Sequence, residues 1–575
     1  MAVMSRPQRW DNPFDSNMTD ALVDRILGIP PFSRMDPSRF SLAAPLRDII
    51  RNDTRMVQYQ PGDIVVREGD YGNSAFFIVN GALRVVLDHM PPAALGRREK
   101  KRKGVFEVLS QAFNARKGIE ARDLEAYAGS SQGKGWRGAG ASTHVFLQDI
   151  PGILNEHKTV RLEAGEFFGE IAALGRIPRT ATVFADGQAE LLEIRWQGLR
   201  DLRSRVDELK HHIDQLYRER SLKIHLRETP LFHHLSEEVL TEIADQTIFE
   251  TYGNFDWHTS YKSLAEASAA HRLDHEPIIV EEGQYPNGLL LIRSGFGRVS
   301  ERFGHGHRTR AYLGRGHLFG LDELVHNWRE DTQIPFRNTL RALGYVDVLV
   351  VPASVIERHV LGPNRDRPLV PTDLLPQPVS PTPVPLTLEQ ESKSQTADLV
   401  VELLVENRFI NGTATMVINL DRCTRCDDCV RACASTHDNN PRFIRQGRQF
   451  GRYMIANACM HCADPVCMIG CPTGAIHRNA LEGQVVINDA TCIGCATCAN
   501  SCPYNNIQMV EIRNKEGAFV LDQQTHTPIM KATKCDLCAD QVIGGPACQR
   551  ACPHDALRRM DLHNSPESLV DWIVR

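Results

Sequence analysis

The chain has 575 residues, enough for three or four domains at roughly 150 residues each. Hydrophobic residues make up 42% and charged residues 24%, a composition that excludes a largely disordered protein. The net charge of -5 argues against bulk nucleic-acid binding and leaves room only for a local basic patch. We find no run of about 18 apolar residues and no export signal at the N-terminus, so we expect a cytoplasmic protein without a transmembrane segment.

The N-terminal part contains a repeat. Residues 61–69 (PGDIVVREG) and residues 275–283 (HEPIIVEEG) each lead into an apolar strand that ends at a glycine, Gly81 or Gly295. Short β-rich runs separated by glycine turns predict antiparallel β-rolls, and an internal duplication is the simplest explanation of two of them. We therefore predict one roll over 1–225 and a second over 226–362.

The first roll carries a motif with phosphate-binding chemistry. The segment FFGEIAAL (167–174) is followed by Pro178-Arg179-Thr180. A short helix start offers backbone N–H groups to an anion, and a guanidinium suits bidentate phosphate contact. The segment resembles the phosphate-binding cassette of cyclic nucleotide-binding domains of the catabolite activator protein family. The resemblance implies that Gly169, Arg179 and Thr180 hold a cyclic phosphate and that Glu170 accepts a hydrogen bond from the ribose. A cassette kept as a fold element, with an empty pocket, is the alternative.

The second roll has a degraded version of this motif. Gly320 is followed by Leu321, where the first roll has Glu170. We match Arg337 to Arg179, although a longer loop precedes it. The second roll is therefore predicted to be structural.

The two copies differ in length, because the first roll contains an insertion. The first roll has about 63 more residues than the second between matching positions, which places an insert at about 87–157. The insert contains a basic run at 97–103 and a Gly/Ser-rich stretch at 129–142. The basic run could contact a phosphate backbone or an acidic partner, and a solvated loop is the alternative.

A heptad pattern follows the first roll and predicts a helix over about 196–222. Its apolar positions are Leu199, Leu202, Val206, Leu209, Ile213 and Leu216. In the catabolite activator family the helix at this place forms the dimer interface, which implies homodimerisation here. Packing on the core of its own domain, or on the second roll, is the alternative. Neither roll is followed by a helix-turn-helix segment, which weakens an interpretation as a transcription factor.

A proline-rich segment divides the chain. Residues 363–385 contain eight prolines, and a polar run follows at 389–396. Such a composition favours extended polyproline II and does not build a packed core. We predict a linker over 363–398, with a surface loop inside one domain as the alternative.

Every cysteine of the protein lies after this linker. There are 16, in four sets of four. The sets are Cys423, Cys426, Cys429, Cys433; Cys459, Cys462, Cys467, Cys471; Cys492, Cys495, Cys498, Cys502; and Cys535, Cys538, Cys548, Cys552. The first and third have the C-x2-C-x2-C-x3-C spacing of bacterial ferredoxins, in which three thiolates hold one [4Fe–4S] cluster and the fourth reaches a neighbouring one. Disulfides would need an exported protein, and zinc would need only C-x2-C pairs.

The order of the sets resembles that of the four-cluster electron-transfer subunit of dimethyl sulfoxide reductase, formate dehydrogenase, nitrite reductase and some [NiFe]-hydrogenases. The resemblance covers about 416–562 and implies a ferredoxin-type domain over 399–575. It also implies four ligand groups. They are Cys423, Cys426, Cys429 with Cys552; Cys535, Cys538, Cys548 with Cys433; Cys459, Cys462, Cys467 with Cys502; and Cys492, Cys495, Cys498 with Cys471.

The sequence thus predicts a multidomain α+β protein with two cyclic nucleotide-binding-like rolls and a double ferredoxin-like domain that holds four clusters. We interpret it as the iron–sulfur subunit of a larger oxidoreductase, with the rolls serving regulation or docking. It has no G-x-G-x-x-G or P-loop fingerprint, so a molybdopterin, nickel–iron or flavin centre is expected on a partner chain. A signalling protein that responds to redox state or to a cyclic nucleotide is the alternative.

Overall fold

The computed structural model describes residues 2–86, 159–209, 222–375 and 399–574, with short gaps in each range, together with Arg122 and His157. The chain forms two compact units. The first joins Met1–Gln215 to Thr415–Arg559, and the second joins Leu216–Ala414 to Met560–Arg575. These units differ from the predicted domains, because the first roll shares a unit with the cysteine-rich part. Within the described ranges, no helix has the length and apolar character needed to cross a membrane.

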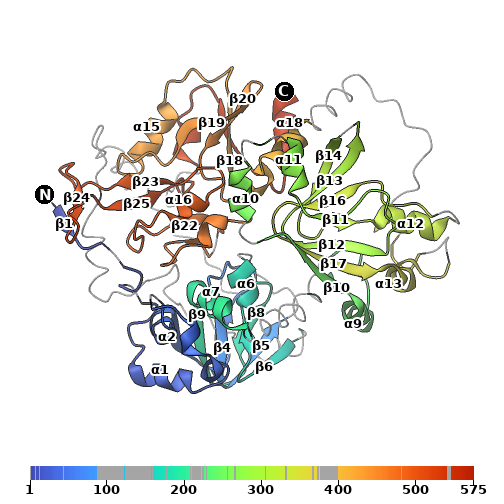
Figure 1. Cartoon of the computed structure of the whole chain (residues 1–575), viewed down its shortest axis with the longest axis horizontal. Coiled ribbons are helices and arrows are strands. Elements are labelled where there is room, and N and C mark those ends of the chain that lie inside the picture. The colour runs from blue at the N-terminus through green and yellow to red at the C-terminus, as the bar shows by residue number, and fades with distance from the viewer. Residues whose placement is uncertain are drawn as a thin grey trace. The chain divides into compact units, whose positions relative to one another are not determined.

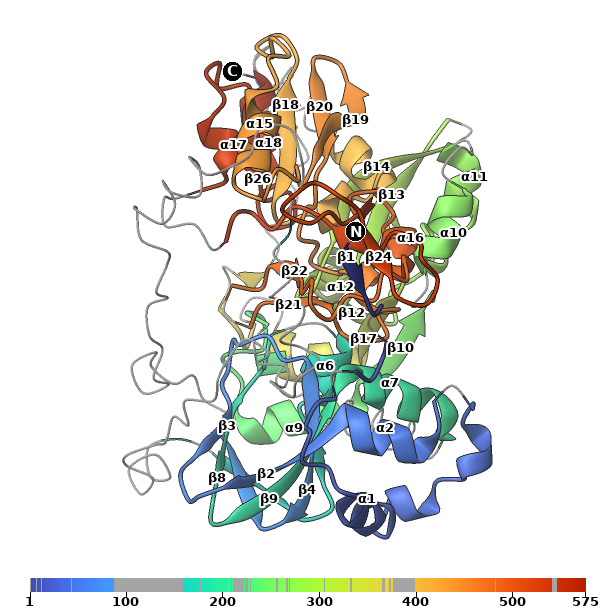
Figure 2. The same cartoon turned by 90° about the vertical axis from the view of Figure 1, so that its left-hand side faces the viewer.

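The first roll consists of two four-stranded antiparallel sheets, with helices beside them (Figures 1 and 2). One sheet has the order β2 (Thr54–Tyr59), β9 (Ala189–Arg195), β4 (Ser74–Asn80), β7 (Phe167–Phe168), and the other β3 (Ile64–Val66), β8 (Thr182–Ala185), β5 (Ala82–Val86), β6 (Thr159–Glu163). The helices are α1 (Asp20–Leu27), α2 (Leu46–Asp53), α6 (Glu170–Gly175) and α7 (Trp196–Arg205). The apolar run AFFIV of β4 is buried almost throughout, as expected for a central strand.

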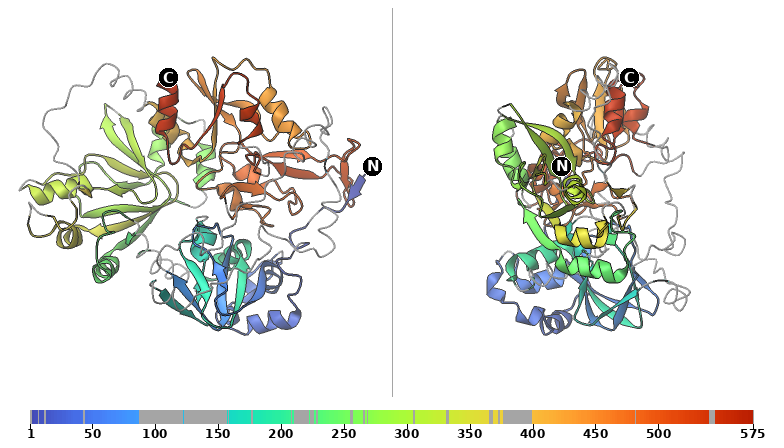
Figure 3. Two further views of the ribbon diagram at one scale, coloured as in Figure 1. Left: turned by 180° about the vertical axis from the view of Figure 1, so that it is seen from behind. Right: turned by 90° about the vertical axis from the view of Figure 1, so that its right-hand side faces the viewer.

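The second roll repeats this topology strand for strand (Figure 3, green to yellow). Its sheets are β10 (Ile248–Tyr252), β17 (Val346–Pro352), β12 (Gly288–Ser294), β15 (Leu318–Phe319) and β11 (Ile278–Val280), β16 (Thr339–Ala342), β13 (Gly297–Phe303), β14 (Gly306–Leu313). Its helices include α9 (Glu237–Gln246), α10 (Trp257–Ser263), α11 (Ala269–Asp274), α12 (Leu321–Arg329) and α13 (Ala353–Ile356). The two rolls are therefore copies of one cyclic nucleotide-binding-like fold.

The second roll extends into the predicted linker. Val370 and Leu375 are buried in its hydrophobic core, and the backbone amide of Leu369 donates to the carbonyl of Val360 at 3.1 Å. The roll therefore ends later than residue 362. Residues 376–398 lie outside the described part of the protein.

The predicted helix over 196–222 is not continuous. Helix α7 ends at Arg205, and Val206 adopts an extended backbone with φ -123°. Leu199 and Leu202, the first two positions of the predicted seam, are fully buried, and α7 packs on α2 of the same roll. These two leucines therefore serve the core of their own domain, which was the alternative interpretation. Residues 210–221, with the end of the seam, lie outside the described residues.

The described residues of the cysteine-rich part form one four-stranded sheet and two small antiparallel strand pairs. The sheet has the order β19 (Ile444–Phe450), β20 (Tyr453–Asn457), β18 (Thr415–Asn419), β26 (Leu557–Met560). The paired strands are β21 (Ile476–Arg478) with β22 (Val485–Ile487) and β23 (Gln508–Glu511) with β25 (Met530–Thr533). At the N-terminus, β1 (Ala2–Met4) adds in parallel to β24 (Val520–Asp522), as Figure 2 shows.

Both ends of the predicted ferredoxin domain belong with the second roll. Glu406 forms ion pairs with Arg298 at 2.7 Å and Arg272 at 2.8 Å. The hydroxyl of Tyr312 donates to the carbonyl of Leu562 at 3.3 Å, in the segment that leads to α18 (Glu567–Val574). The polar side chains of this roll therefore hold the segments on either side of the cysteine-rich part.

Candidate functional site

None of the sixteen cysteines forms a disulfide, and they lie on short helices and on the loops beside them. Helix α15 (Asp428–Ser435) carries Cys429 and Cys433 and packs on α17 (Ala547–Arg550), which carries Cys548. Helix α16 (Thr497–Ser501) carries Cys498 and packs on the turn Val466–Met468, which carries Cys467. The packing therefore brings the first set to the fourth and the second to the third.

Electrostatic interactions between the thiols fall mainly into four groups, each with one cysteine from another set, and the interaction of Cys429 with Cys548 joins two of these groups. The groups are Cys423 and Cys429 with Cys552; Cys535, Cys538 and Cys548 with Cys433; Cys459, Cys462 and Cys467 with Cys502; and Cys492, Cys495 and Cys498 with Cys471. Cys426, which was predicted to join the first group, is exposed. The ligand groups that the family resemblance implies remain predictions, which these four thiol groups support.

The backbone of the cysteine loops curls through conformations that few residues adopt. Asp427, Ala496 and Leu537 all have φ near 60°, and each lies between two cysteines of a set. Left-handed non-glycine residues are strained, and they cluster at functional sites. The strain here serves to curl each loop around its group of thiols.

The chemistry of these thiols favours a shared metal cluster. Burial, together with the charges of neighbouring thiols, raises the pKa of Cys429 to about 11 and that of Cys498 to about 12. Backbone amides nevertheless donate to sulfur, as from Arg442 to Cys433 Sγ at 3.3 Å. A bound metal deprotonates such thiols and satisfies their charge. The residues therefore fit an iron–sulfur cofactor.

Four cationic side chains lie beside the thiol groups, and sequence reasoning missed them all. Each donates to the main-chain carbonyl of a cysteine. The contacts are Arg478 to Cys462 at 2.7 Å, Lys531 to Cys492 at 2.5 Å, Lys534 to Cys535 at 2.8 Å and Arg559 to Cys459 at 3.0 Å. Lys531 and Lys534 are 0% and 2% exposed. Buried cations are costly without an opposite charge, and thiolate-ligated clusters supply one.

A signal for two of these cations is present in the sequence. Arg478 ends the segment CPTGAIHR, which begins at Cys471, and Arg559 ends CPHDALRR, which begins at Cys552. Both have the form C-P-x-x-A-[I/L]-x-R. A comparison of the residues that follow each cysteine set would therefore have found them.

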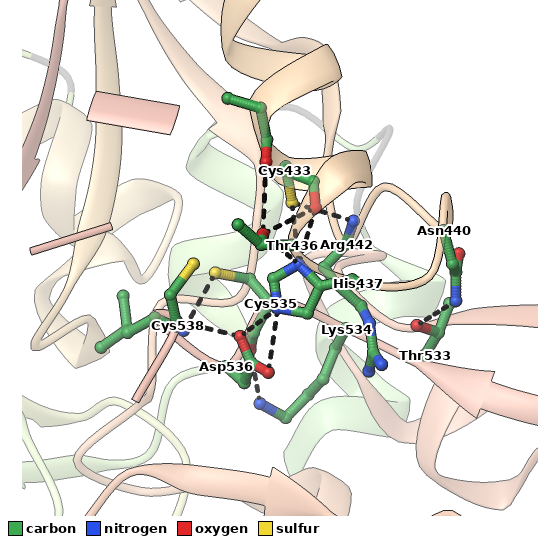
Figure 4. A network of polar contacts seen from close by, with 12 residues as sticks. Cys433, Thr436, His437, Asn440, Arg442, Thr533, Lys534, Cys535, Asp536 and Cys538 are labelled. Atoms are coloured by element: carbon green, nitrogen blue, oxygen red, sulfur yellow. Dashed lines mark hydrogen bonds and ion pairs between the residues drawn. The ribbon is translucent and has the colours of Figure 1, made fainter. Parts of the chain in front are cut away.

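A polar network joins the first and fourth cysteine sets (Figure 4). His437 Nε2 lies 3.0 Å from Asp536 Oδ1, which also accepts the amide of Cys538 at 3.0 Å. His437 Nδ1 lies 2.7 Å from the carbonyl of Cys433. Burial favours the neutral form of Asp536, but the contact with His437 lowers its pKa overall. The pair fixes the two ligand loops to each other.

The predicted nucleotide residues of the first roll converge on Arg179. Its guanidinium is 6% exposed and donates to the carbonyls of Gly169 and Ser74, both at 2.7 Å. Burial lowers its pKa to about 10, while carboxylates that include Glu170 act in the opposite direction. Glu170 is 1% exposed at the start of α6, and Thr180 is half-buried. The cassette is therefore assembled, with its arginine held by backbone carbonyls.

Glycines make room for this arginine. A Cβ on Gly72 would lie 2.1 Å from Arg179 Cζ, and one on Gly169 would lie 2.5 Å from its Nη1. Gly169 also has φ 78°, which other residues rarely adopt. The position of the guanidinium thus depends on both glycines.

The match of Arg337 to Arg179 is wrong by one residue. The amide of Gly69 donates to the carbonyl of Arg179 at 2.8 Å, and the equivalent amide of Gly283 donates to that of Phe336 at 2.9 Å. Phe336 is buried, whereas Arg337 is exposed. The longer loop before this position had obscured the register.

An apolar side chain fills the cassette of the second roll. The ring of Phe336 stacks on Phe319 with centroids 5.4 Å apart, and a Cβ on Gly320 would lie 2.7 Å from it. Phe336, and not a cationic side chain, therefore stands at the position equivalent to Arg179.

The first roll contacts the cysteine-rich part of its own unit through the segment beside Arg179. The amide of Tyr71 donates to the carbonyl of Ala480 at 2.9 Å, and Asn73 Nδ2 donates to that of Arg478 at 3.2 Å. The guanidinium of Arg478 also lies over the ring of Tyr71, 4.9 Å from its centroid. One short segment therefore touches both the cassette arginine and a cation beside Cys462.

Most of the predicted insert, with its basic run at 97–103 and the stretch at 129–142, lies outside the described residues. Arg122 is described and is 5% exposed. Its amide donates to the carbonyl of Arg513 at 2.8 Å, and its guanidinium pairs with Asp489 at 2.5 Å. At this residue the insert contacts the cysteine-rich part.

Two family models match the chain. The model of the 4Fe-4S dicluster domain matches residues 451–562, and that of the cyclic nucleotide-binding domain matches residues 153–206. These matches agree with the two resemblances found in the sequence.

Curated relatives match the cysteine-rich part. The chain is 36% identical over 157 residues to one component of the anaerobic dimethyl sulfoxide reductase of Haemophilus influenzae, and the match covers 24% of this chain and 68% of that protein. It is 30% identical to one of the subunits of the sulfite dehydrogenase of Allochromatium vinosum, over 28% of this chain and 73% of that protein.

Solved structures match the rolls. The regulatory domain of Toxoplasma gondii PKA, crystallised with cAMP, covers 59% of this chain and 92% of its own at 14% identity, with a TM-score of 0.19. A score this low carries no argument, so the cyclic nucleotide-binding assignment rests on the family model.

Proposed function

Since the protein is a member of the family of 4Fe-4S electron-transfer subunits that serves anaerobic dimethyl sulfoxide reductase, we propose that it carries electrons through four [4Fe–4S] clusters held by its sixteen cysteines. The observation that carries the proposal is the association of the thiols into four groups. Cys426 completes the group of Cys423, Cys429 and Cys552 when the metal is present. Such clusters accept and release single electrons.

The substrate chemistry belongs to a partner in this proposal. Two of the relatives that match are components of oxidoreductases by name. We assign the catalytic centre, whether molybdopterin, nickel–iron or flavin, to a partner chain, and the complex to the cytoplasm. Homodimerisation is not part of the proposal, because Leu199 and Leu202 are already buried.

Metal analysis tests the cluster assignment. We expect about sixteen iron and sixteen sulfide per chain after anaerobic purification. Cys429→Ser should disturb one cluster and leave the others largely intact. Zinc at a few equivalents, with little sulfide, would contradict the proposal. A second test is turnover: the chain alone should accept electrons from dithionite but should not turn over dissolved substrates.

A second candidate function is regulation by a cyclic nucleotide bound in the first roll, at Gly169, Glu170, Arg179 and Thr180. The observation that favours it is the segment from Tyr71 to Ser74. Arg179 donates to the carbonyl of Ser74, and Tyr71 lies against Arg478, which also donates to the carbonyl of Cys462. A nucleotide phosphate that draws Arg179 from its carbonyl partners would move this segment.

Cyclic nucleotide binding and the reduction potentials of the clusters are measured together to test this candidate function. Calorimetry on the full chain with cyclic AMP and cyclic GMP should give heat at micromolar concentration. The full chain is needed, because the first roll shares a compact unit with the cysteine-rich part. Binding with a shifted cluster potential supports regulation, and binding without a shift contradicts it. No heat at high micromolar concentration would assign both rolls to docking.

A further inference from the structure

Arg559 on β26 touches two of the four thiol groups. Its Nη2 donates to Cys535 Sγ at 3.0 Å, and its Nη1 donates to the carbonyl of Cys459 at 3.0 Å. Cys535 belongs with Cys433, whereas Cys459 belongs with Cys502. One guanidinium therefore lies where two neighbouring groups meet.

Arg559 carries a positive charge, because a guanidinium stays protonated in proteins. Arg478, at the equivalent place of the C-P-x-x-A-[I/L]-x-R repeat, donates to the carbonyls of Cys462, Ala463 and Gly483. The contact to sulfur thus distinguishes Arg559 from its counterpart.

A donor to a ligand sulfur acts differently on the two redox states. Reduction adds a negative charge to a cluster, so a nearby cation and an N–H group that faces sulfur stabilise the reduced state more than the oxidised state. Burial strengthens this effect because the local dielectric is low. The result is a higher reduction potential for the cluster whose sulfur is contacted.

We propose that Arg559 is a positioning residue that raises the reduction potential of the cluster held by Cys433, Cys535, Cys538 and Cys548. Through the carbonyl of Cys459 it also fixes the loop of the adjacent cluster. This inference rests on the proposed function, because it requires that both clusters are present.

The test is an EPR-monitored redox titration of the full chain. Arg559→Met should lower the constant for one-electron reduction of one cluster at least tenfold, which is about 59 mV. The shift at the Cys459 cluster should be smaller, and the remaining two should not change. Arg559→Lys retains the positive charge but loses the planar guanidinium with its two donors. The potential of the cluster in this variant should therefore lie between those of Arg559→Met and the unsubstituted chain. Cys548→Ser identifies the affected signal.

The neighbouring arginine provides a matched control. Arg558 pairs with Asp555 at 3.0 Å, and its side chain is 42% exposed. Arg558→Met removes the same charge one residue away and should leave all four potentials unchanged. An equal shift in both variants, or no shift in Arg559→Met, would overturn the proposal.

Two further outcomes are also decisive. If Arg559→Met does not retain the cluster, Arg559→Gln decides: a lower potential supports the role of the charge, and an unchanged one overturns it. Fewer than four clusters in the unsubstituted chain would instead contradict the proposed function. That failure is distinguishable because it appears before any substitution is made.

Discussion

The two β-rolls share one backbone but differ at the position that decides their chemistry. In the first roll the amide of Gly69 donates to the carbonyl of Arg179. In the second roll the equivalent amide of Gly283 donates to the carbonyl of Phe336. The arginine is held by backbone carbonyls and surrounded by glycines, whereas the phenylalanine packs on an aromatic neighbour. The comparison teaches that a duplicated fold can keep the backbone hydrogen bonds at one position while an apolar side chain replaces a charged one.

The same comparison applies to the segment that precedes β4 and β12. Asn73 and Asn287 occupy equivalent places, since their carbonyls accept the amides of Trp196 and Ala353. The tyrosines two residues earlier therefore also correspond. Tyr71 lies against Arg478, whereas Tyr285 is 64% exposed. The copy that kept the arginine is thus also the copy whose segment contacts the cysteine-rich part.

The largest effect is expected when the aromatic side chain in the cassette of the second roll is removed. Phe336→Ala should lower the free energy of unfolding of the second unit by about 3–5 kcal/mol, because it removes a buried aromatic ring and leaves a cavity. Denaturant titration measures this loss. Arg337→Ala, one residue further on and exposed, should change stability by less than about 0.5 kcal/mol. Equal losses of stability in Phe336→Ala and Arg337→Ala would contradict the alignment of Phe336 with Arg179.

The second effect concerns the charge in the first roll. If a cyclic nucleotide binds there, Arg179→Ala should cost about 2–5 kcal/mol of binding free energy, roughly 30- to several-thousand-fold in affinity. Removing one partner of a buried charge-assisted contact leaves the other unpaired. Calorimetry on the full chain measures the change, and Phe336→Leu is the control that should leave affinity as it was. Unchanged affinity in Arg179→Ala would rule out this pocket.

These residues show what sequence could and could not supply. The duplication, the strands that end at Gly81 and Gly295, and the four cysteine sets follow from local sequence patterns, whereas the grouping of cysteines across the sets came from the family resemblance. The register at Phe336 was not predictable, because a longer loop precedes it and only a backbone hydrogen bond fixes the alignment. The role of Lys534 was not predictable either, because a lysine beside a cysteine has no pattern that indicates burial.

A smaller effect is expected at the ribose position. Glu170→Ala should weaken nucleotide binding by about 1.5–3 kcal/mol, roughly 10- to 150-fold, because a hydrogen bond to a charged acceptor is lost. Leu321→Ala, at the place of Glu170 in the second roll, is the matched variant and should not affect binding. Titration calorimetry with both variants measures the difference. A loss in Glu170→Ala as large as that in Arg179→Ala would contradict the separate roles of the two residues.

The smallest effect tests the contact of the first roll within its unit. Tyr71→Ala should remove the ring from under the guanidinium of Arg478, a contact worth about 1–2 kcal/mol when it is desolvated. Local opening should then become easier by roughly 5- to 30-fold, because each 1.4 kcal/mol is a tenfold change in equilibrium. The measurement is hydrogen exchange at the backbone amide of Tyr71, which donates to the carbonyl of Ala480. The same backbone amide is followed in the alanine variant. Tyr285→Ala removes the same ring from the exposed, equivalent place and should leave exchange in both units unchanged. Faster exchange in Tyr285→Ala but not in Tyr71→Ala would contradict the prediction. It would mean that the ring of Tyr285, and not that of Tyr71, protects its segment from exchange.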